Sequence, residues 1–130
     1  MSGSIDSITF DAAHAATLAR FWCEVLDDYE IAPYTAEDIA QLKAKGIDDV
    51  EDDPNVLALP KGGGGPRLFF QKVPEAKSAK SRVHLDVTLR DRSHLERLIE
   101  LGATVVREWD DGRGYWMNDP DGNDFCVYLP

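Results

Sequence analysis

A strand, a helix and three further strands are indicated twice along this chain, and the repeat constrains the fold more than any other feature. Residues 5–12 alternate apolar and polar side chains, as a half-buried strand does, and residues 14–27 place apolar side chains at helical spacing. Segment 82–103 repeats this strand and helix, and three strand patterns follow each time. The sequence therefore predicts an α+β protein of two β-α-β-β-β modules, at about 5–74 and about 82–130.

Length and charge limit the function classes. A chain of 130 residues suits a single domain spanning 1–130, and 43% hydrophobic residues fit a globular protein. The formal net charge of −10 disfavours nucleic acid as a partner. No apolar stretch is long enough to span a bilayer and no signal-peptide pattern opens the chain, so we expect a cytoplasmic protein that does not bind membranes.

The connections in the first half carry turn residues and charge. Residues 35–54 read as a helical stretch closed by Gly46 and followed by an acidic run, which predicts a solvated surface insertion rather than a calcium loop. Strands at 55–59 and 67–73 predict a hairpin with Gly62–Gly65 at its tip. The polar segment 74–81 fits a linker between the halves.

The second half opens with a strand that carries candidate catalytic residues. In RVHLDVTL, Val83, Leu85 and Val87 are predicted to face one way and His84, Asp86 and Thr88 the other. Asp86 on the same face as His84 could orient the imidazole as a general base, or the histidine could be hydrogen-bonded structure on a polar wall.

The helix after this strand has its own boundary signals. Ser93 and Glu96 stand at capping-box spacing, and Gly102 is placed to end the helix.

Other polar and aromatic side chains are candidates for binding. Thr9 and Asp11 share one side of the first strand, where Asp11 either binds a substrate group or forms a structural salt bridge with an arginine such as Arg67. Cys126 is a candidate metal ligand, a nucleophile or a small buried apolar residue, and both cysteines are expected to be reduced. Aromatic surface for stacking on a ligand comes from Phe69, Trp109, Tyr115, Trp116 and Tyr128.

Three stretches resemble the vicinal oxygen chelate superfamily, which includes glyoxalases, bleomycin-resistance proteins and extradiol dioxygenases. MNDPDGNDFCVY is similar to its C-terminal signature. ITFDAAHAATLARFWCEVL resembles the first strand and helix of the glyoxalase-like branch, and PRLFFQKVPEAKSAKSRVHLDV its mid-chain junction. The resemblance implies that the two modules form a curved mixed sheet around a small-molecule cavity, commonly with a divalent metal held by the first and fourth strands of each module.

The same resemblance implies a set of site residues. Metal-ligand positions fall near Ser7, at Phe69 or Gln71, at His84 and at Cys126. Cys126 stands where a carboxylate is usual, and Ser7 stands where a histidine or glutamine is usual. The implied metal set is therefore His84, Gln71 and Cys126, which includes zinc-binding types. The implied ligand-binding positions are Thr9, Asp11, Phe69, Gln71, Trp116 and Tyr128.

Two functions follow as hypotheses from this resemblance. The first is a metal-assisted lyase or isomerase that acts on a small oxygenated metabolite, with His84 and Asp86 in the catalytic site. The alternative is a non-catalytic protein that binds or sequesters a small molecule, as bleomycin-resistance proteins do. A structural interaction domain is a third reading that nothing in the sequence demands. The resemblance is also compatible with a homodimer.

Overall fold

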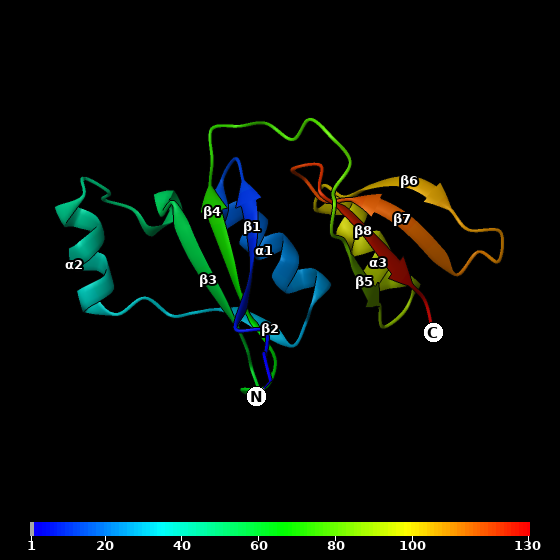
Figure 1. Cartoon of the computed structure of the whole chain (residues 1–130), viewed down its shortest axis with the longest axis horizontal. Coiled ribbons are helices and arrows are strands. Elements are labelled where there is room, and N and C mark those ends of the chain that lie inside the picture. The colour runs from blue at the N-terminus through cyan, green and yellow to red at the C-terminus, as the bar shows by residue number, and fades with distance from the viewer. Residues whose placement is uncertain (1) are drawn as a thin grey trace. The chain divides into compact units, whose positions relative to one another are not determined.

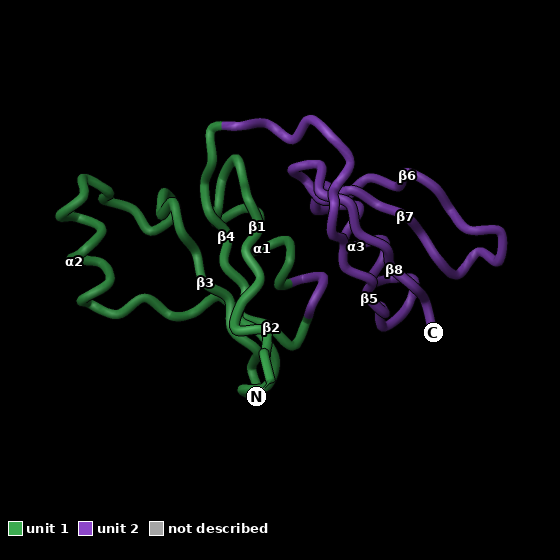
Figure 2. Tube along the Cα trace, in the orientation of Figure 1, with its two compact units in different colours: residues 1–23, 27–74 green, residues 24–26, 75–130 purple. Residues whose placement is uncertain are grey.

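The computed structural model describes residues 2–130, and the chain forms two compact units (Figures 1 and 2). The first unit comprises residues 2–23 and 27–74, and the second comprises residues 24–26 and 75–130. Each unit has its own four-stranded mixed sheet. The predicted α+β class with two β-α-β-β-β modules is therefore confirmed.

The first unit has the strand order β1-β4-β3-β2, in which β1 and β4 run parallel and the other neighbours antiparallel. This arrangement includes the predicted hairpin between β3 and β4. The elements are β1 (Ser7–Ala12), α1 (Ala15–Val25), β2 (Tyr29–Ile31), α2 (Ala36–Ala44), the short 3-10 helix η1 (Val50–Asp52), β3 (Asn55–Pro60) and β4 (Arg67–Lys72).

Helix α1 covers one face of the first sheet. Its apolar stripe places Trp22 against Phe10 of β1, with ring centroids 4.8 Å apart, and Phe10 stacks on Phe70 of β4 at 5.1 Å. Alternation along the strands sends the odd-numbered residues of β1 and β4 to the opposite face. On that face Thr9, Asp11 and Gln71 are exposed. The unit thus has one packed face and one open, largely polar face.

The second unit repeats this plan with the strand order β5-β8-β7-β6, in which β5 and β8 are the parallel pair. Its core includes Leu98 of α3 and Phe125 of β8, both fully buried. The elements are β5 (Leu85–Thr88), α3 (Arg92–Glu100), β6 (Thr104–Glu108), β7 (Gly114–Asn118) and β8 (Asp124–Tyr128).

A predicted strand boundary differs from the structure. Strand β5 begins at Leu85, and Val83 is 83% exposed rather than on the apolar face.

The predicted capping box of α3 is wrong. Asp91 is the N-cap, and its side chain accepts a hydrogen bond from the His94 backbone N–H at 2.9 Å. Ser93 donates its hydroxyl to Asp91 instead of starting the helix, because a carboxylate two residues earlier already caps it. Gly102, with φ of +111°, follows the end of α3 as predicted.

Candidate functional site

Three metal-ligand side chains meet on the open face of the second sheet. Asp86 lies opposite Cys126 in the parallel β5–β8 register. His84 Nε2 lies 3.2 Å from Asp86 Oδ1, and the ligand atoms of all three residues lie within 4.8 Å of one another. The group combines His84 and Asp86, the two residues predicted as catalytic, with Cys126, and His84 and Cys126 were both also predicted as metal ligands.

Strand geometry explains why these residues converge. Asp86 and Cys126 are paired neighbours, so their side chains leave the sheet on the same side. His84 precedes Asp86 by two residues and reaches that side from just before β5. Cys126 is only 8% exposed, whereas His84 and Asp86 are open to solvent. A small ion or ligand would therefore meet a buried thiol beneath two accessible polar side chains.

Burial raises the pKa of the Cys126 thiol, and the nearby negative charge of Asp86 raises it further, while the positive charge of Lys80 opposes the change. With no metal ion bound, Cys126 is therefore a protonated thiol at neutral pH. Only the thiolate binds a metal, so metal binding at this group must release a proton.

Lys80 belongs to this face, and the sequence analysis missed it. Its ammonium lies 2.7 Å from Asp124 Oδ2 and 5.5 Å from the centre of the Trp116 ring. Ser81 also donates its hydroxyl to Asp124, so the supposed linker is fastened to the start of β8. The repeated AKS in an otherwise acidic chain was the available signal for this lysine. Its composition alone indicated only a polar linker.

The Asp124 carboxylate is held in its charged form by these contacts. Burial alone would raise its pKa, but the hydrogen bonds from Lys80 and Ser81 and the charge of Lys80 outweigh burial and lower the pKa. Lys77 adds a longer ion pair at 3.9 Å. Asp124 is therefore the anchor that places Lys80 near the cluster.

Two predicted ligand-binding aromatics share this open face. Trp116 pairs with Cys126 across β7 and β8, and Tyr128, 40% exposed, follows Cys126 by two residues. Tyr115 is buried on the opposite face, so it does not belong with them. Trp109 packs against Gly114, where an added Cβ would come within 2.1 Å of its ring.

The predicted site residues of the first unit lie together on its open face. Thr9 pairs with Phe69 and Asp11 with Gln71 in the β1–β4 register. The Gln71 side-chain amide donates to Asp11 Oδ1 at 2.8 Å.

The arginine considered as a partner for Asp11 bonds elsewhere. Arg67 donates to Asp6 at 2.6 Å, so the salt bridge to Arg67, one of the alternatives for Asp11, does not form. Ser7, the implied ligand position of the first strand, is the first residue of β1 and is paired with Arg67.

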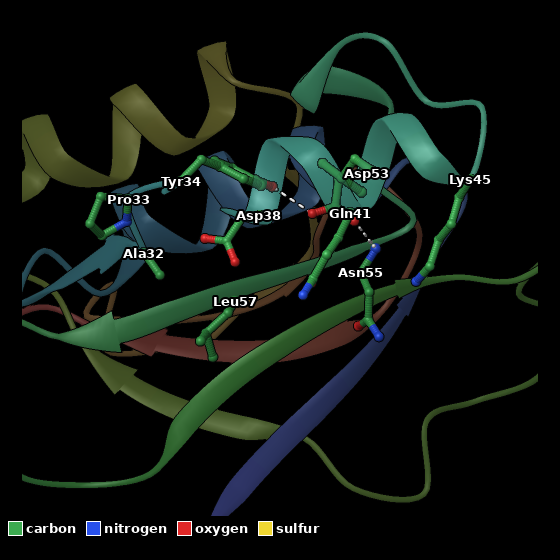
Figure 3. A pocket seen from close by; sticks show the side chains of 10 residues that line it. Ala32, Pro33, Tyr34, Asp38, Gln41, Lys45, Asp53, Asn55 and Leu57 are labelled. Carbon is green, nitrogen blue, oxygen red and sulfur yellow. Dashed lines mark hydrogen bonds between the residues drawn. The ribbon is translucent and has the colours of Figure 1, made fainter. Parts of the chain in front are cut away.

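A pocket of about 260 Å³ lies beneath α2 in the first unit (Figure 3). Helix side chains reach down toward β3, where Asn55 and Leu57 form the floor. Sequence analysis predicted the helix as a surface insertion but could not place it over a strand. The lining consists of Ala32, Pro33, Tyr34, Asp38, Gln41, Leu42, Lys45, Asp53, Asn55 and Leu57.

Comparison with known families agrees with this architecture. The glyoxalase-like domain family matches residues 7–128, nearly the whole chain. The chain belongs to this family. No curated protein matches the glyoxalase-like sequence. Within residues 2–130, no helix is long and apolar enough to cross a membrane.

Solved structures share the fold of this glyoxalase-like domain at low sequence identity. The fosfomycin resistance protein FosX from Mesorhizobium loti is 17% identical with a TM-score of 0.65, over 98% of this chain and 92% of that one. A FosX variant from Listeria monocytogenes, in complex with Mn(II) and 1S,2S-dihydroxypropylphosphonic acid, is 12% identical with a TM-score of 0.62, over 98% and 90%. The oxidase ChaP-H2 is 15% identical with a TM-score of 0.58, over 100% and 95%.

Proposed function

We propose that this glyoxalase-like domain is a metal-assisted enzyme, a lyase or isomerase, whose substrate is a small oxygenated metabolite. The observation that carries the proposal is the meeting of His84, Asp86 and Cys126, whose ligand atoms lie within 4.8 Å of one another. The fold relation to FosX supports the class of substrate, since one such structure contains Mn(II) and a dihydroxypropylphosphonic acid.

The donor set fits a divalent metal. Imidazole, thiolate and carboxylate are all zinc ligands, and three protein ligands leave a position for water or substrate, as in catalytic zinc sites. The buried thiol favours zinc or another soft ion over magnesium or calcium. Bound there, the metal would polarise an oxygen of the substrate. Gln71 already donates to Asp11, and we assign it to ligand binding on the first sheet rather than to the metal.

The surrounding side chains suit an oxygen-rich ligand. Asp86 Oδ1 lies 3.2 Å from His84 Nε2, so these two ligand side chains are already close together. The Lys80 ammonium supplies positive charge on the same side, and it remains partly exposed while bound to Asp124. The half-exposed rings of Trp116 and Tyr128 provide apolar contact.

The second candidate is a binding protein without catalysis, and the exposed aromatic surface favours it. Trp116 carries Lys80 above its ring, and Phe69 of the first sheet carries Arg67 at 5.4 Å. Aromatic side chains on an open sheet face can contact flat, partly apolar ligands without help from a metal. This function would survive the removal of every metal ligand, which distinguishes it from the first.

Cobalt binding tests the metal site directly. We expect the protein, stripped with chelator and titrated with Co²⁺, to show a thiolate-to-cobalt charge-transfer band that disappears in Cys126→Ser. Cys23→Ser is the matched control, because Cys23 lies in α1 of the other sequence half and should leave the band intact. If Cys126→Ser binds cobalt with unchanged affinity, the proposed metal site is wrong.

A further inference from the structure

Helix α2 differs from the other two helices in having no core to pack on. None of its nine residues is buried, whereas α1 and α3 each bury an apolar stripe. A helix this short is marginal without tertiary packing. Its N-terminus is fixed instead by a reciprocal capping box, in which Thr35 and Asp38 each accept the other's backbone N–H.

The side of α2 that faces β3 is largely polar, with Leu42 as its apolar residue. Asp38, Gln41 and Lys45 follow one another at helical spacing and point toward the strand (Figure 3). The apolar part of the pocket comes from Leu57 on the floor and from Leu42 of α2 itself. A helix that presents a polar stripe to a sheet leaves space rather than a packed interface, and this space is the pocket of about 260 Å³.

The acceptors of this pocket are largely engaged. Asp53 accepts the Tyr34 hydroxyl at 2.7 Å through one oxygen and the Asn55 backbone N–H at 2.9 Å through the other. Burial and the hydrogen bond to Asp53 raise the pKa of Tyr34, so the phenol keeps its proton and its bond. Asp38 uses one oxygen in the capping box.

The donors, in contrast, are available. Within residues 2–130, neither the Lys45 ammonium nor the Asn55 side-chain amide has a hydrogen-bond or ion-pair partner. Gln41 makes only a long contact of 3.4 Å to Glu37. Three donor groups thus border one cavity beside an apolar floor, while the acceptors already have partners.

We propose that the pocket beneath α2 binds a small monocarboxylic acid, with its carboxylate at Lys45, Gln41 and Asn55 and its apolar part over Leu57 and Leu42. Asp38 and Asp53 in the same lining repel a second negative charge, which selects a monoanion over a phosphate dianion. This inference goes beyond the proposed metal chemistry and does not depend on it, because all the residues involved lie between 32 and 57.

Hexanoate is a suitable probe, with hexanol as the uncharged match and inorganic phosphate as the competing anion. We expect hexanoate to shift the backbone amide resonances of residues 32–57 in the chelator-treated full chain. Loss of the Lys45 charge in Lys45→Met should weaken binding about tenfold or more, as expected when a charge-assisted hydrogen bond is lost. Lys43→Met, on the same helix but outside the pocket, should bind hexanoate as the unaltered chain does.

The other outcomes are decisive against the inference. Absence of shifts around the pocket, or equal affinity in the unaltered chain and Lys45→Met, would overturn it. Tighter binding of hexanol or phosphate than of hexanoate would overturn the choice of a monocarboxylate. Because the chain is metal-free in every arm, none of these results bears on the cobalt experiment, and the two proposals can fail separately.

Discussion

The two units share one topology but present different chemistry on equivalent strands. The parallel pair β1–β4 places Asp11 beside Gln71, and the two side chains bond each other at 2.8 Å. The corresponding pair β5–β8 places Asp86 beside Cys126, with His84 next to the carboxylate. On the open face of the first unit, the two polar side chains are therefore hydrogen-bonded to each other. The open face of the second unit offers three side chains of the kinds that bind metals.

The connections differ as well. Helix α2 and the 3-10 helix η1 separate β2 from β3 in the first unit, whereas a short turn after Glu108 joins β6 to β7 in the second. In both units the helix-covered face provides the core and the open face provides the functional groups. The comparison shows that a packed sheet can be repeated while its open face and its connections acquire separate roles.

The largest expected effect concerns the part the units share. Phe70 of β4 and Phe125 of β8 are both 0% exposed. Replacing either by alanine should lower the free energy of unfolding by about 3–5 kcal/mol, because a large cavity is left in a packed core. Urea denaturation measures the free energy of unfolding of each variant. A much smaller loss in one variant would show that the two cores are not equivalent.

The next effect separates the two open faces. His84→Ala should weaken zinc or cobalt binding by more than about a hundredfold, because it removes one of three protein ligands. Gln71→Ala should leave the metal affinity unchanged. Competition with a chromophoric chelator gives both affinities, and a comparable loss in Gln71→Ala would assign that amide to the metal after all.

Fastening of segment 74–81 to β8 predicts a stability effect in the second unit. Asp124→Asn removes the acceptor charge for Lys80 and leaves a buried amide in place of a paired carboxylate. We expect a loss of about 1–3 kcal/mol in the free energy of unfolding. Thermal and urea unfolding, followed by circular dichroism, provide the measurement, and no loss would mean that the anchor is dispensable.

The same carboxylate predicts a dependence on pH. Folding lowers the pKa of Asp124 below its ordinary 3.8, so the folded state favours the charged form. Its stabilising contribution is complete above the ordinary pKa and is lost as the pH falls through the lowered one. The difference in unfolding free energy between the unaltered chain and Asp124→Asn should therefore shrink in acid. A difference that stays constant from neutral pH to strongly acidic pH would contradict this linkage.

The smallest effect is expected at the exposed pair of the first unit. Asp6 and Arg67 lie 2.6 Å apart, but both side chains are well exposed to water. Asp6→Asn should leave the free energy of unfolding nearly unchanged, since solvent screens such pairs. Urea denaturation of Asp6→Asn and Asp124→Asn side by side compares the exposed pair with the buried one. A loss of stability in Asp6→Asn as large as that in Asp124→Asn would contradict the prediction.

Much of the fold could be predicted because local patterns determine it. Alternation in SITFDA and the apolar stripe that includes Trp22 were enough to place β1 and α1. The start of β5 was predicted too early, at a segment that includes Val83, because the alternation begins before the first residue paired with β8. Pairing depends on two segments, so one segment's pattern does not show where it begins. The cap of α3 was misassigned because Asp91 and Ser93 both suit that role, and only the fold decides between them.

The site was predictable in its ligand types but not in its grouping. His84, Asp86 and Cys126 were all singled out from the sequence, yet Asp86 was expected to support His84 rather than to join a three-residue group. Their convergence depends on β5–β8 register, and the role of Lys80 depends on where a segment without periodicity is fastened. The pocket beneath α2 depends on which strand the helix covers, and no local pattern encodes that.

Helix α2 buries no residue, and this has a consequence for how the protein can change over time. Substitutions at Gln41 or Lys45 remove no core contact, so they alter the pocket at almost no cost in folding free energy. Selection for a stable fold therefore leaves these positions free, and selection for a ligand can act on them alone. Within a lineage, specificity should diverge first along this helix, while the sheet beneath it stays as it is.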